Sequence, residues 1–276
     1  MCNYRKDSGN SEIKEMVPEL IDWCRRQLAS SGGDKAVIGI SGGKDSTVVA
    51  ALMAAAIGAD SVYGFILPAG DQNDLETAQE ICRHLQICYQ VIDIAAIIAA
   101  FNSCLSAVSD SGIINQVSAQ TDLNLPPRVR MALLYAISQS IPDSRVINTS
   151  NLSEDWIGYI TLYGDSAGAF APLGMLTSDE VIAVGHELGV PARYLLLPPA
   201  DGLTGRSDEE VFGFSYAELN DYIRNGELVN QETKAQIDRL HRISRFKFLP
   251  LPMFRPPFAI KANDLANIYQ QGDKQQ

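Results

Sequence analysis

The sequence predicts an α/β protein whose core is a Rossmann-like, open, parallel, five-stranded sheet with helices on both faces. Short runs of apolar and β-branched residues recur along the chain, and stretches with helical periodicity separate them. Strands that alternate with helices are joined by crossover connections, so they lie parallel and are covered on both sides. At 276 residues the chain can bury a full core, and we expect a single domain over residues 1–276.

The expected elements follow from these two periodicities. The strands are expected at residues 36–40, 62–67, 88–92, 146–149 and 194–197. The helices are expected at 13–28, 44–57, 75–85, 94–105, 124–140, 178–188, 216–225 and 231–243. Two helix starts carry a capping box, formed by Thr177 with Glu180 and by Ser215 with Glu218. The serine-rich interval 102–122 is expected to be an irregular excursion near a site, or a mobile lid.

Composition excludes several classes of protein. The formal charge of −11 opposes the attraction on which nonspecific nucleic-acid binding depends, although a nucleotide ligand remains possible. The five cysteines are odd in number and form no CxxC pair, so we expect reduced thiols in a cytoplasmic protein and no zinc site. No apolar run approaches the roughly 18 residues that span a bilayer, which argues against membrane insertion and export.

The segment AVIGISGGKDST, residues 36–47, has the pattern of a strand, a tight turn and a helix. Gly42 and Gly43 let backbone N–H groups and the positive end of the helix face an anion. The loop is not a Walker A motif, because Asp45 follows the lysine, and it does not match GxGxxG. Glycines that only serve packing are the alternative, but Ser41, Asp45 and Ser46 add hydroxyls for phosphate and a carboxylate for a metal.

The loops at residues 41–46, 68–73 and 150–154 each follow an expected strand. In open parallel sheets, ligands bind beyond the carboxyl ends of the strands. We therefore expect these three loops to converge on one crevice.

Two segments carry a resemblance to a known family. SGGKDS resembles the SGGxDS loop of the ATP pyrophosphatase (PP-loop) superfamily, whose members split ATP between the α and β phosphates. RVINTSNLSEDWIGYITLYGDSAGAFAPLGMLT, residues 145–177, is similar to the central signature of the NAD synthetases. The segments 124–131 and 198–223 are similar to a helix start and to a mobile acidic loop of the same family, in the same order along the chain.

The resemblance implies an adenine nucleotide alpha hydrolase-like fold and an ammonia-dependent NAD⁺ synthase. It implies that the carboxylate of nicotinic acid adenine dinucleotide (deamido-NAD) attacks the α-phosphorus of ATP, and that ammonia then displaces AMP. Small-molecule substrates, Mg²⁺ and a homodimer with no nucleic-acid or membrane partner are the further expectations.

Asp45 and Glu154 are the expected metal ligands, because Mg²⁺ prefers oxygen donors shared between one or two carboxylates and phosphates. Each of them is alternatively an exposed acid favoured by a helix dipole. Arg128 and Arg130 provide bidentate donors for anions, unless they form a solvated basic face. The family match assigns Arg130 to ATP and Arg128 to the dinucleotide.

The remaining site residues are assigned by the resemblance. Asp165 matches the acid that holds or deprotonates ammonia, and a simple Gly-Asp turn is the alternative. Thr149 matches a position near the nucleotide, unless its hydroxyl only caps the following turn. Tyr135 can stack on a base, although most aromatic residues at such spacing are core residues. His241 or its neighbour Lys247, near the carboxyl-terminal basic cluster of the family, is an expected substrate contact. The full expected ATP site is Gly39, Ser41, Gly42, Gly43, Asp45, Ser46, Leu67, Arg130 and Thr149.

Two positions depart from the family pattern. Pro126 and Ser178 stand where the family usually has lysines, and the second of those lysines faces the ATP phosphates. Losing such a cation removes stabilisation of transition-state charge, unless Lys44 or Lys247 replaces it. Two alternatives therefore stay open: another PP-loop ligase that adenylates a different acceptor, and a nucleotide-binding protein without catalysis.

Overall fold

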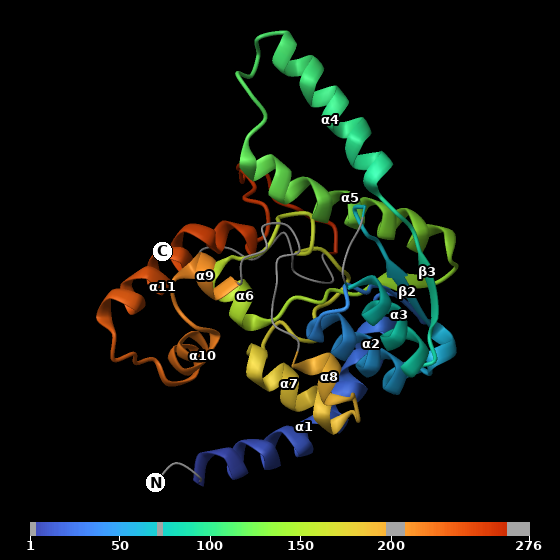
Figure 1. Cartoon of the computed structure of the whole chain (residues 1–276), viewed down its shortest axis with the longest axis vertical. Helices are drawn as coiled ribbons and strands as arrows, with labels where there is room; N and C mark the ends of the chain where they lie inside the picture. Colours follow the sequence, from blue (N-terminus) through green and yellow to red (C-terminus); the bar gives the residue numbers. More distant parts are fainter. Residues whose placement is uncertain (1–3, 71–73, 197–207, 264–276) are drawn as a thin grey trace.

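The computed structural model describes residues 4–70, 74–196 and 208–263, and it confirms the α/β class (Figure 1). The four strands found among these residues are β1 (Lys35–Gly39), β2 (Val62–Ile66), β3 (Cys88–Val91) and β4 (Ser144–Val146). They are parallel and lie in the order β3-β2-β1-β4. The register pairs Val37 of β1 with Tyr63 of β2 on one side and with Val146 of β4 on the other.

Alternate residues of β1 face two separate apolar clusters. Ala36 and Ile38 pack into the larger cluster with α1 (Tyr4–Ser30), α2 (Lys44–Ile57), α3 (Leu75–His84), α7 (Ser178–Glu187) and α8 (Ala192–Leu195). Val37 faces the opposite cluster, which is covered by α5 (Ala119–Ser140) and by the start of α4 (Ala95–Asp110). The period of two along the strand therefore sets which helices cover which face.

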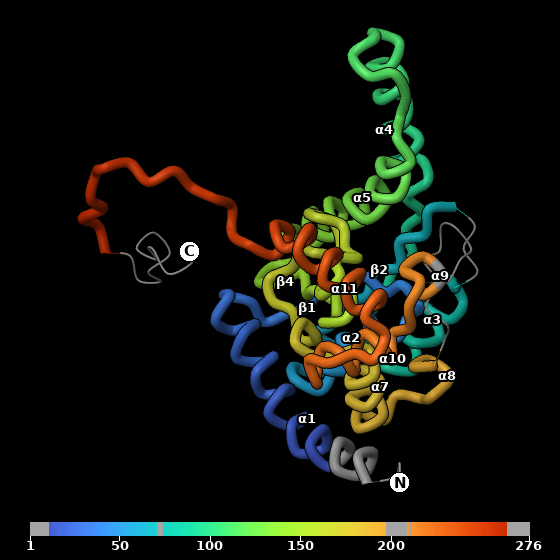
Figure 2. Tube along the Cα trace, turned by 90° about the vertical axis from the view of Figure 1, so that its left-hand side faces the viewer, coloured from blue at the N-terminus to red at the C-terminus, as the bar shows by residue number. Residues whose placement is uncertain are grey.

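A third apolar cluster lies beside the sheet and outside both of its covering layers (Figure 1). It joins α6 (Leu152–Ile157), α9 (Asp208–Phe212), α10 (Tyr216–Asn225) and α11 (Gln231–Ser244) around Leu219 and Ile237, which are fully buried. The short helices η1 (Ala59–Ser61) and η2 (Arg245–Lys247) complete the described elements. After η2, residues 249–263 run away from the body without a helix or strand (Figure 2).

The prediction of a fifth strand at residues 194–197 is wrong for the residues that the structure describes, and Leu197 lies outside them. Tyr194 and Leu195 are buried, but they belong to the one-turn helix α8, which packs on the helical layer and not on the sheet. A short apolar run does not by itself distinguish a strand from a buried helix.

The expected irregular excursion at residues 102–122 is mostly helical. α4 continues to Asp110 and α5 begins at Ala119, so only the link between them is irregular. Serine hydroxyls are satisfied within the helix: Ser106 Oγ donates to the Asn102 carbonyl oxygen at 3.0 Å. Because serine can bond back to the preceding turn, a serine-rich composition does not exclude a helix. α4 and the start of α5 project together from the body (Figures 1 and 2).

The predicted capping boxes are confirmed. At α10, the Glu218 backbone N–H donates to Ser215 Oγ at 3.2 Å, and the Glu218 carboxylate accepts from the Ser215 backbone N–H at 3.0 Å. The box of Thr177 and Glu180 starts α7 in the same way. In the described part of the chain, no helix is both long enough and apolar enough to cross a membrane.

Candidate functional site

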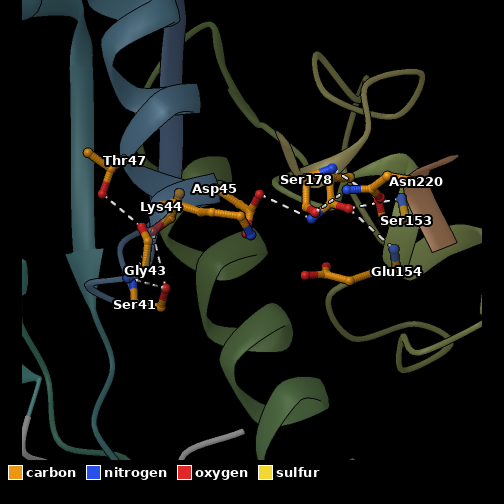
Figure 3. Close-up of polar contacts among 11 residues, drawn as sticks. Ser41, Gly43, Lys44, Asp45, Thr47, Ser153, Glu154, Ser178 and Asn220 are labelled. Atoms are coloured by element: carbon orange, nitrogen blue, oxygen red, sulfur yellow. Dashed lines mark hydrogen bonds and ion pairs between the residues drawn. The ribbon is translucent and has the colours of Figure 1, made fainter. Parts of the chain in front are cut away.

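From β1 the chain adds β2 and then β3 on one side of the sheet, and it later returns to add β4 on the other side of β1. In open parallel sheets this switch point opens a crevice at the carboxyl ends of the strands. The loop after β1 and the loop after β4 meet there, and Figure 3 shows their side chains facing one another. The convergence of these two loops is therefore confirmed. In the third expected loop, residues 71–73 lie outside the described part of the chain.

The loop after β1 is a tight turn with glycine at its strained position. Gly42 has φ of +91°, and a Cβ there would lie 3.1 Å from the Asp74 carbonyl oxygen. The Gly43 backbone N–H donates to Ser41 Oγ at 3.2 Å, and Ser46 Oγ donates to the Gly43 carbonyl oxygen at 3.2 Å. Gly43 is the N-cap of α2 and has no side chain that could cap the helix. The first turn of α2 is therefore suited to an external anion.

The carboxylate of Asp45, in the first turn of α2, is held by two donors of different kinds. Lys44 Nζ donates to Oδ2 at 2.8 Å, and Asn151 Nδ2 donates to Oδ1 at 3.1 Å. The side chains of Lys44 and Asp45 are only 14% and 20% exposed, so this ion pair is screened less than a surface pair. The amide from Asn151 bridges a separation of 106 residues between the two loops.

Asn151 also sets the start of α6. Its Oδ1 accepts from the backbone N–H groups of Ser153 at 2.9 Å and Glu154 at 3.2 Å, which makes it the N-cap. Glu154 consequently lies in the first turn of α6, and its carboxylate points toward the side of Asp45 (Figure 3). One buried amide side chain thus orients both predicted metal ligands.

A polar network fixes the starts of α6 and α7 against α10. Ser153 Oγ donates to Asn220 Oδ1 at 2.5 Å and accepts from the Ser178 backbone N–H at 2.9 Å. Asn220 Nδ2 donates to Ser178 Oγ at 3.0 Å, and all three side chains are buried. At the position where the family pattern has a lysine, Ser178 therefore contributes a neutral, internally satisfied hydroxyl. Pro126, at the other departure, is buried within α5.

A second group of charges gathers around Asp165, which follows α6 in the chain. Asp165 Oδ1 accepts from the Thr161 backbone N–H at 2.8 Å. Part of Asp165 is open to solvent, yet the protein around its carboxyl removes enough hydration to raise its pKa. Burial lowers the pKa of the nearby Arg130 guanidinium and the Lys247 ammonium, and the Asp165 carboxylate opposes both shifts. These three groups therefore influence one another's protonation.

The two predicted arginines lie at different depths. Arg130 is half-buried, and its Nε donates to the Leu67 carbonyl oxygen at 2.9 Å, at the end of β2. Arg128 is exposed, and its Nε donates to the Leu162 carbonyl oxygen at 3.1 Å. The Arg128 charge contributes to lowering the pKa of Lys247. A spacing of two on a helix thus sends the side chains to different neighbours, as expected.

The other predicted residues are distributed around these two centres. Gly39 ends β1, where a Cβ would lie 3.2 Å from Leu134, and Thr149 is half-buried just after β4. Tyr135 is exposed on α5. His241 lies on α11, where Nδ1 is 2.9 Å from the Trp156 carbonyl oxygen and the two rings are 4.1 Å apart. Lys247 Nζ donates at 2.8 Å to the Gly158 and Ile160 carbonyl oxygens.

Sequence reasoning did not assign roles to Asn151, Asn220 or Asp155. Asn151 carried a local signal, since an asparagine before a short helix is a typical N-cap. Asp155 is unusual because its Oδ1 is buried and has no hydrogen-bond partner among the described residues. Burial raises its pKa to about 7; the Asp165 carboxylate adds to this shift and the Arg245 guanidinium opposes it.

The donor set at the switch point fits Mg²⁺ that is shared with a phosphate. Among residues 4–70, 74–196 and 208–263, no three His, Cys, Asp or Glu side chains gather closely enough to bind a metal by themselves. Asp45 and Glu154 offer two carboxylates on facing helix starts (Figure 3). Mg²⁺ is commonly bound by one or two carboxylates together with substrate phosphates, so two ligands suffice here.

Comparisons with known proteins agree with this geometry. The family model described as NAD synthase matches residues 16–248. The NH3-dependent NAD+ synthetase of Thermococcus kodakarensis is 37% identical over 213 residues, which cover 77% of this chain and 80% of the relative. The structure of an NMN synthetase from Francisella tularensis has a TM-score of 0.79 and 30% identity, covering 89% of this chain and 99% of that one. The NH3-dependent NAD synthetase from Campylobacter jejuni, in complex with nitrate, has a TM-score of 0.71 and 26% identity, covering 88% and 99%.

The buried carboxyl of Asp155 predicts a pH-dependent gain in stability for Asp155→Asn. The folded-state pKa of Asp155, about 7, lies above the usual value for aspartate, so folding favours the protonated carboxyl. The stability that this preference contributes is lost as pH rises through 7 and the buried carboxyl ionises. Asparagine removes the cost of the buried charge. We expect a gain on the order of 2 kcal/mol at pH 8 and little change at pH 4 in urea unfolding. Asp60→Asn, at an exposed site, should show no such pH-dependent difference, and an equal gain at both pH values would contradict the assignment.

Proposed function

Because the chain belongs to the NAD synthase family, we propose that it forms NAD⁺ by amidating deamido-NAD with ammonia at the expense of ATP. The nicotinate carboxylate attacks the α-phosphorus of ATP, an oxygen–phosphorus bond forms, and pyrophosphate leaves. Ammonia then attacks the acyl carbon of the adenylate, AMP departs with the former carboxylate oxygen, and a proton is lost from nitrogen. A carboxylate is a poor acyl donor, so the adenylate supplies the leaving group that amide formation requires.

The observation that carries this proposal is the meeting of the glycine loop after β1 with the acidic start of α6 after β4. In the proposed reaction, Gly42, Gly43 and the first turn of α2 bind ATP phosphates with Ser41 and Ser46. Gly39, Leu67 and Thr149 border the nucleotide, since they lie at the ends of β1, β2 and β4. Arg130, anchored on the Leu67 carbonyl, faces the same nucleotide.

Asp45 and Glu154 would hold the Mg²⁺ that accompanies ATP. When bound, this ion supplies positive charge to the phosphate oxygens, and so stabilises the charge that develops on the departing pyrophosphate. Asp45 is already oriented by Asn151, and Glu154 by the capping of α6.

Asp165 is the group proposed to accept the proton from ammonium. Its pKa is raised by burial, and the Thr161 backbone N–H fixes one of its oxygens while Arg130 and Lys247 lie close enough to influence its charge. A base with a pKa nearer to neutral transfers protons more effectively at physiological pH. Arg128, Tyr135, His241 and Lys247 are the proposed contacts to the pyridine substrate.

A second substrate is favoured by one specific observation. The Francisella tularensis protein, which matches over 99% of its length with a TM-score of 0.79, is described as an NMN synthetase. The corresponding reaction would amidate nicotinic acid mononucleotide by the same adenylation chemistry. The two substrates share the reacting carboxylate and differ only in the adenylyl half of the dinucleotide.

The direct test incubates the purified protein with ATP, Mg²⁺, ammonium and either deamido-NAD or nicotinic acid mononucleotide. We expect NAD⁺, AMP and pyrophosphate in equal amounts from the dinucleotide, measured by chromatography. Preferential amidation of the mononucleotide would select the second substrate. AMP without either amide would indicate another acceptor, and no product from either acid would indicate a nucleotide-binding protein without catalysis.

Single alanine variants should separate the roles of the two arginines. Arg128→Ala should mainly raise KM for the pyridine substrate, and Arg130→Ala mainly KM for ATP, because their side chains reach different neighbours. Loss of a charge-assisted contact corresponds to roughly tenfold or more in each case. Steady-state kinetics with each substrate varied in turn measures both constants. Equal losses for both substrates in both variants would contradict the division of roles.

We further propose that the protein is a homodimer in which α4 packs against α4 of a second copy. α4 contains no buried residue and no charged residue before Asp110, although it is strongly apolar. Ile97, Phe101, Cys104 and Val108 are exposed and recur at the three-and-four spacing of a helix–helix seam. A projecting helix of this character supports self-association through an isologous contact (Figure 1).

Cys104 provides a test of this dimer, because it lies near the middle of α4 and is exposed. In an antiparallel pair, the two copies of Cys104 lie close together. Mild oxidation or a short bis-maleimide should therefore give a covalent dimer that Cys104→Ser loses and that Cys88→Ser, at the other exposed cysteine of the described residues, retains. Sedimentation of the untreated protein as a monomer at micromolar concentration would refute the proposal.

A further inference from the structure

The two donors on Asp45 differ in kind: one is a buried amide, and the other is an ammonium group at the end of a long side chain. Asn151 is fully buried, and its side chain makes three hydrogen bonds at once: one to Asp45 and two to the start of α6. Moving it would uncap α6 and leave buried polar groups without partners. Lys44 reaches Asp45 Oδ2 through a long side chain that carries three rotatable donors on one ammonium group.

A metal ion and Lys44 cannot use Asp45 Oδ2 in the same way. The ammonium group lies 2.8 Å from that oxygen and offsets the charge of the carboxylate, so it competes with a hard cation for the same oxygen. Two cations beside one carboxylate also repel each other in a half-buried site. A metal bound through Oδ2 therefore weakens the contact of the Lys44 ammonium with Asp45, whereas Asn151 can stay in place.

The direction in which Lys44 can move is set by its position. It is the first residue of α2 and follows Gly43, so it lies beside the helix start where phosphate oxygens are expected. Ser178, at the start of α7, contributes only a neutral hydroxyl that is already bonded to Asn220. A phosphate in this site would therefore gain positive charge from Lys44 that α7 does not supply.

We propose that Lys44 is an exchangeable cation: it neutralises Asp45 before ATP and the metal bind, and it turns to the ATP phosphates when the metal binds Asp45. The exchange keeps the charge near Asp45 balanced before and after ATP binds, and it makes metal binding and ATP binding favour one another. This inference rests on the proposed adenylation reaction, because the metal and the phosphates enter together.

The proposal predicts opposite effects of one substitution on two measurements. In Lys44→Gln without ATP, Mn²⁺ should bind Asp45 about three- to tenfold more tightly, because the competing ammonium is gone. Free Mn²⁺ is measured by electron paramagnetic resonance, so this reading needs no turnover. In the same variant with ATP and substrate, KM for ATP should rise and pyrophosphate release should slow by about tenfold or more.

Matched variants isolate the effect. Lys35→Gln removes the cation of another sequence-adjacent pair, in which Lys35 Nζ lies 2.7 Å from Asp34 Oδ1, at the opposite end of β1. It should change neither Mn²⁺ affinity nor KM for ATP. Asp45→Asn combined with Lys44→Gln should abolish the tighter Mn²⁺ binding, which assigns that binding to Asp45. Thermal unfolding of each variant checks that the fold is retained.

The exchange of Lys44 and the proposed amidation can each fail without the other. Mn²⁺ affinity that is unchanged, weaker or undetectable in Lys44→Gln would overturn the exchange. Tighter Mn²⁺ binding with unchanged ATP affinity would show that Lys44 does not turn to the ATP phosphates, and would overturn that part of the proposal. If the wild-type protein formed no amide, the proposed function would fail, while the Mn²⁺ and ATP affinities measured by calorimetry would still test the exchange.

Discussion

The hydrogen bond from Asn151 to Asp45 connects the two loops on which the whole candidate site depends. The loops follow β1 and β4, which are neighbours in the sheet although the bonded residues are 106 positions apart. Because the same asparagine caps α6, one buried amide contacts both the carboxylate of Asp45 and the backbone N–H of Glu154. A buried amide is suited to this task, since one side chain carries both a donor and an acceptor, and both are expensive to leave unpaired.

The helices outside the sheet extend this support. Ser153, Ser178 and Asn220 join the starts of α6 and α7 to α10 through buried hydrogen bonds. From the other side, the Arg245 guanidinium donates to the Trp156 carbonyl oxygen at 2.9 Å and so ties the end of α11 to α6. The short helix α6, with six residues, would be marginal in isolation, and these contacts are what hold its first turn toward the loop after β1.

The charged side chains of the candidate site form two groups, one at Lys44 and Asp45 and the other around Asp165. At the switch point, Lys44 and Asp45 form a compact pair beside the start of α2, where phosphate charge is expected. Around Asp165, burial shifts acids and bases toward their neutral forms, raising the pKa values of Asp165 and Asp155 and lowering that of Lys247. The first arrangement suits the binding of anions with a hard cation, and the second suits the transfer of protons.

The sequence by itself determined the fold class, the strands β1 to β3 and the loop after β1, because these depend on local periodicity and on glycines in one turn. The fourth strand was expected at 146–149 but lies at 144–146, so only its presence was predicted correctly. Short motifs in the sequence also predict Asp45, Glu154, Arg128, Arg130 and Asp165 as site residues, and these roles remain predictions. The tertiary structure decided that residues 194–195 are helical and that most of 102–122 is too, because burial and back-bonding serine can favour a helix where the local pattern is ambiguous.

Only the tertiary structure brought Asn151 to Asp45 and Asp155 toward Asp165, because distances between remote residues depend on strand order and helix packing, which no local pattern contains.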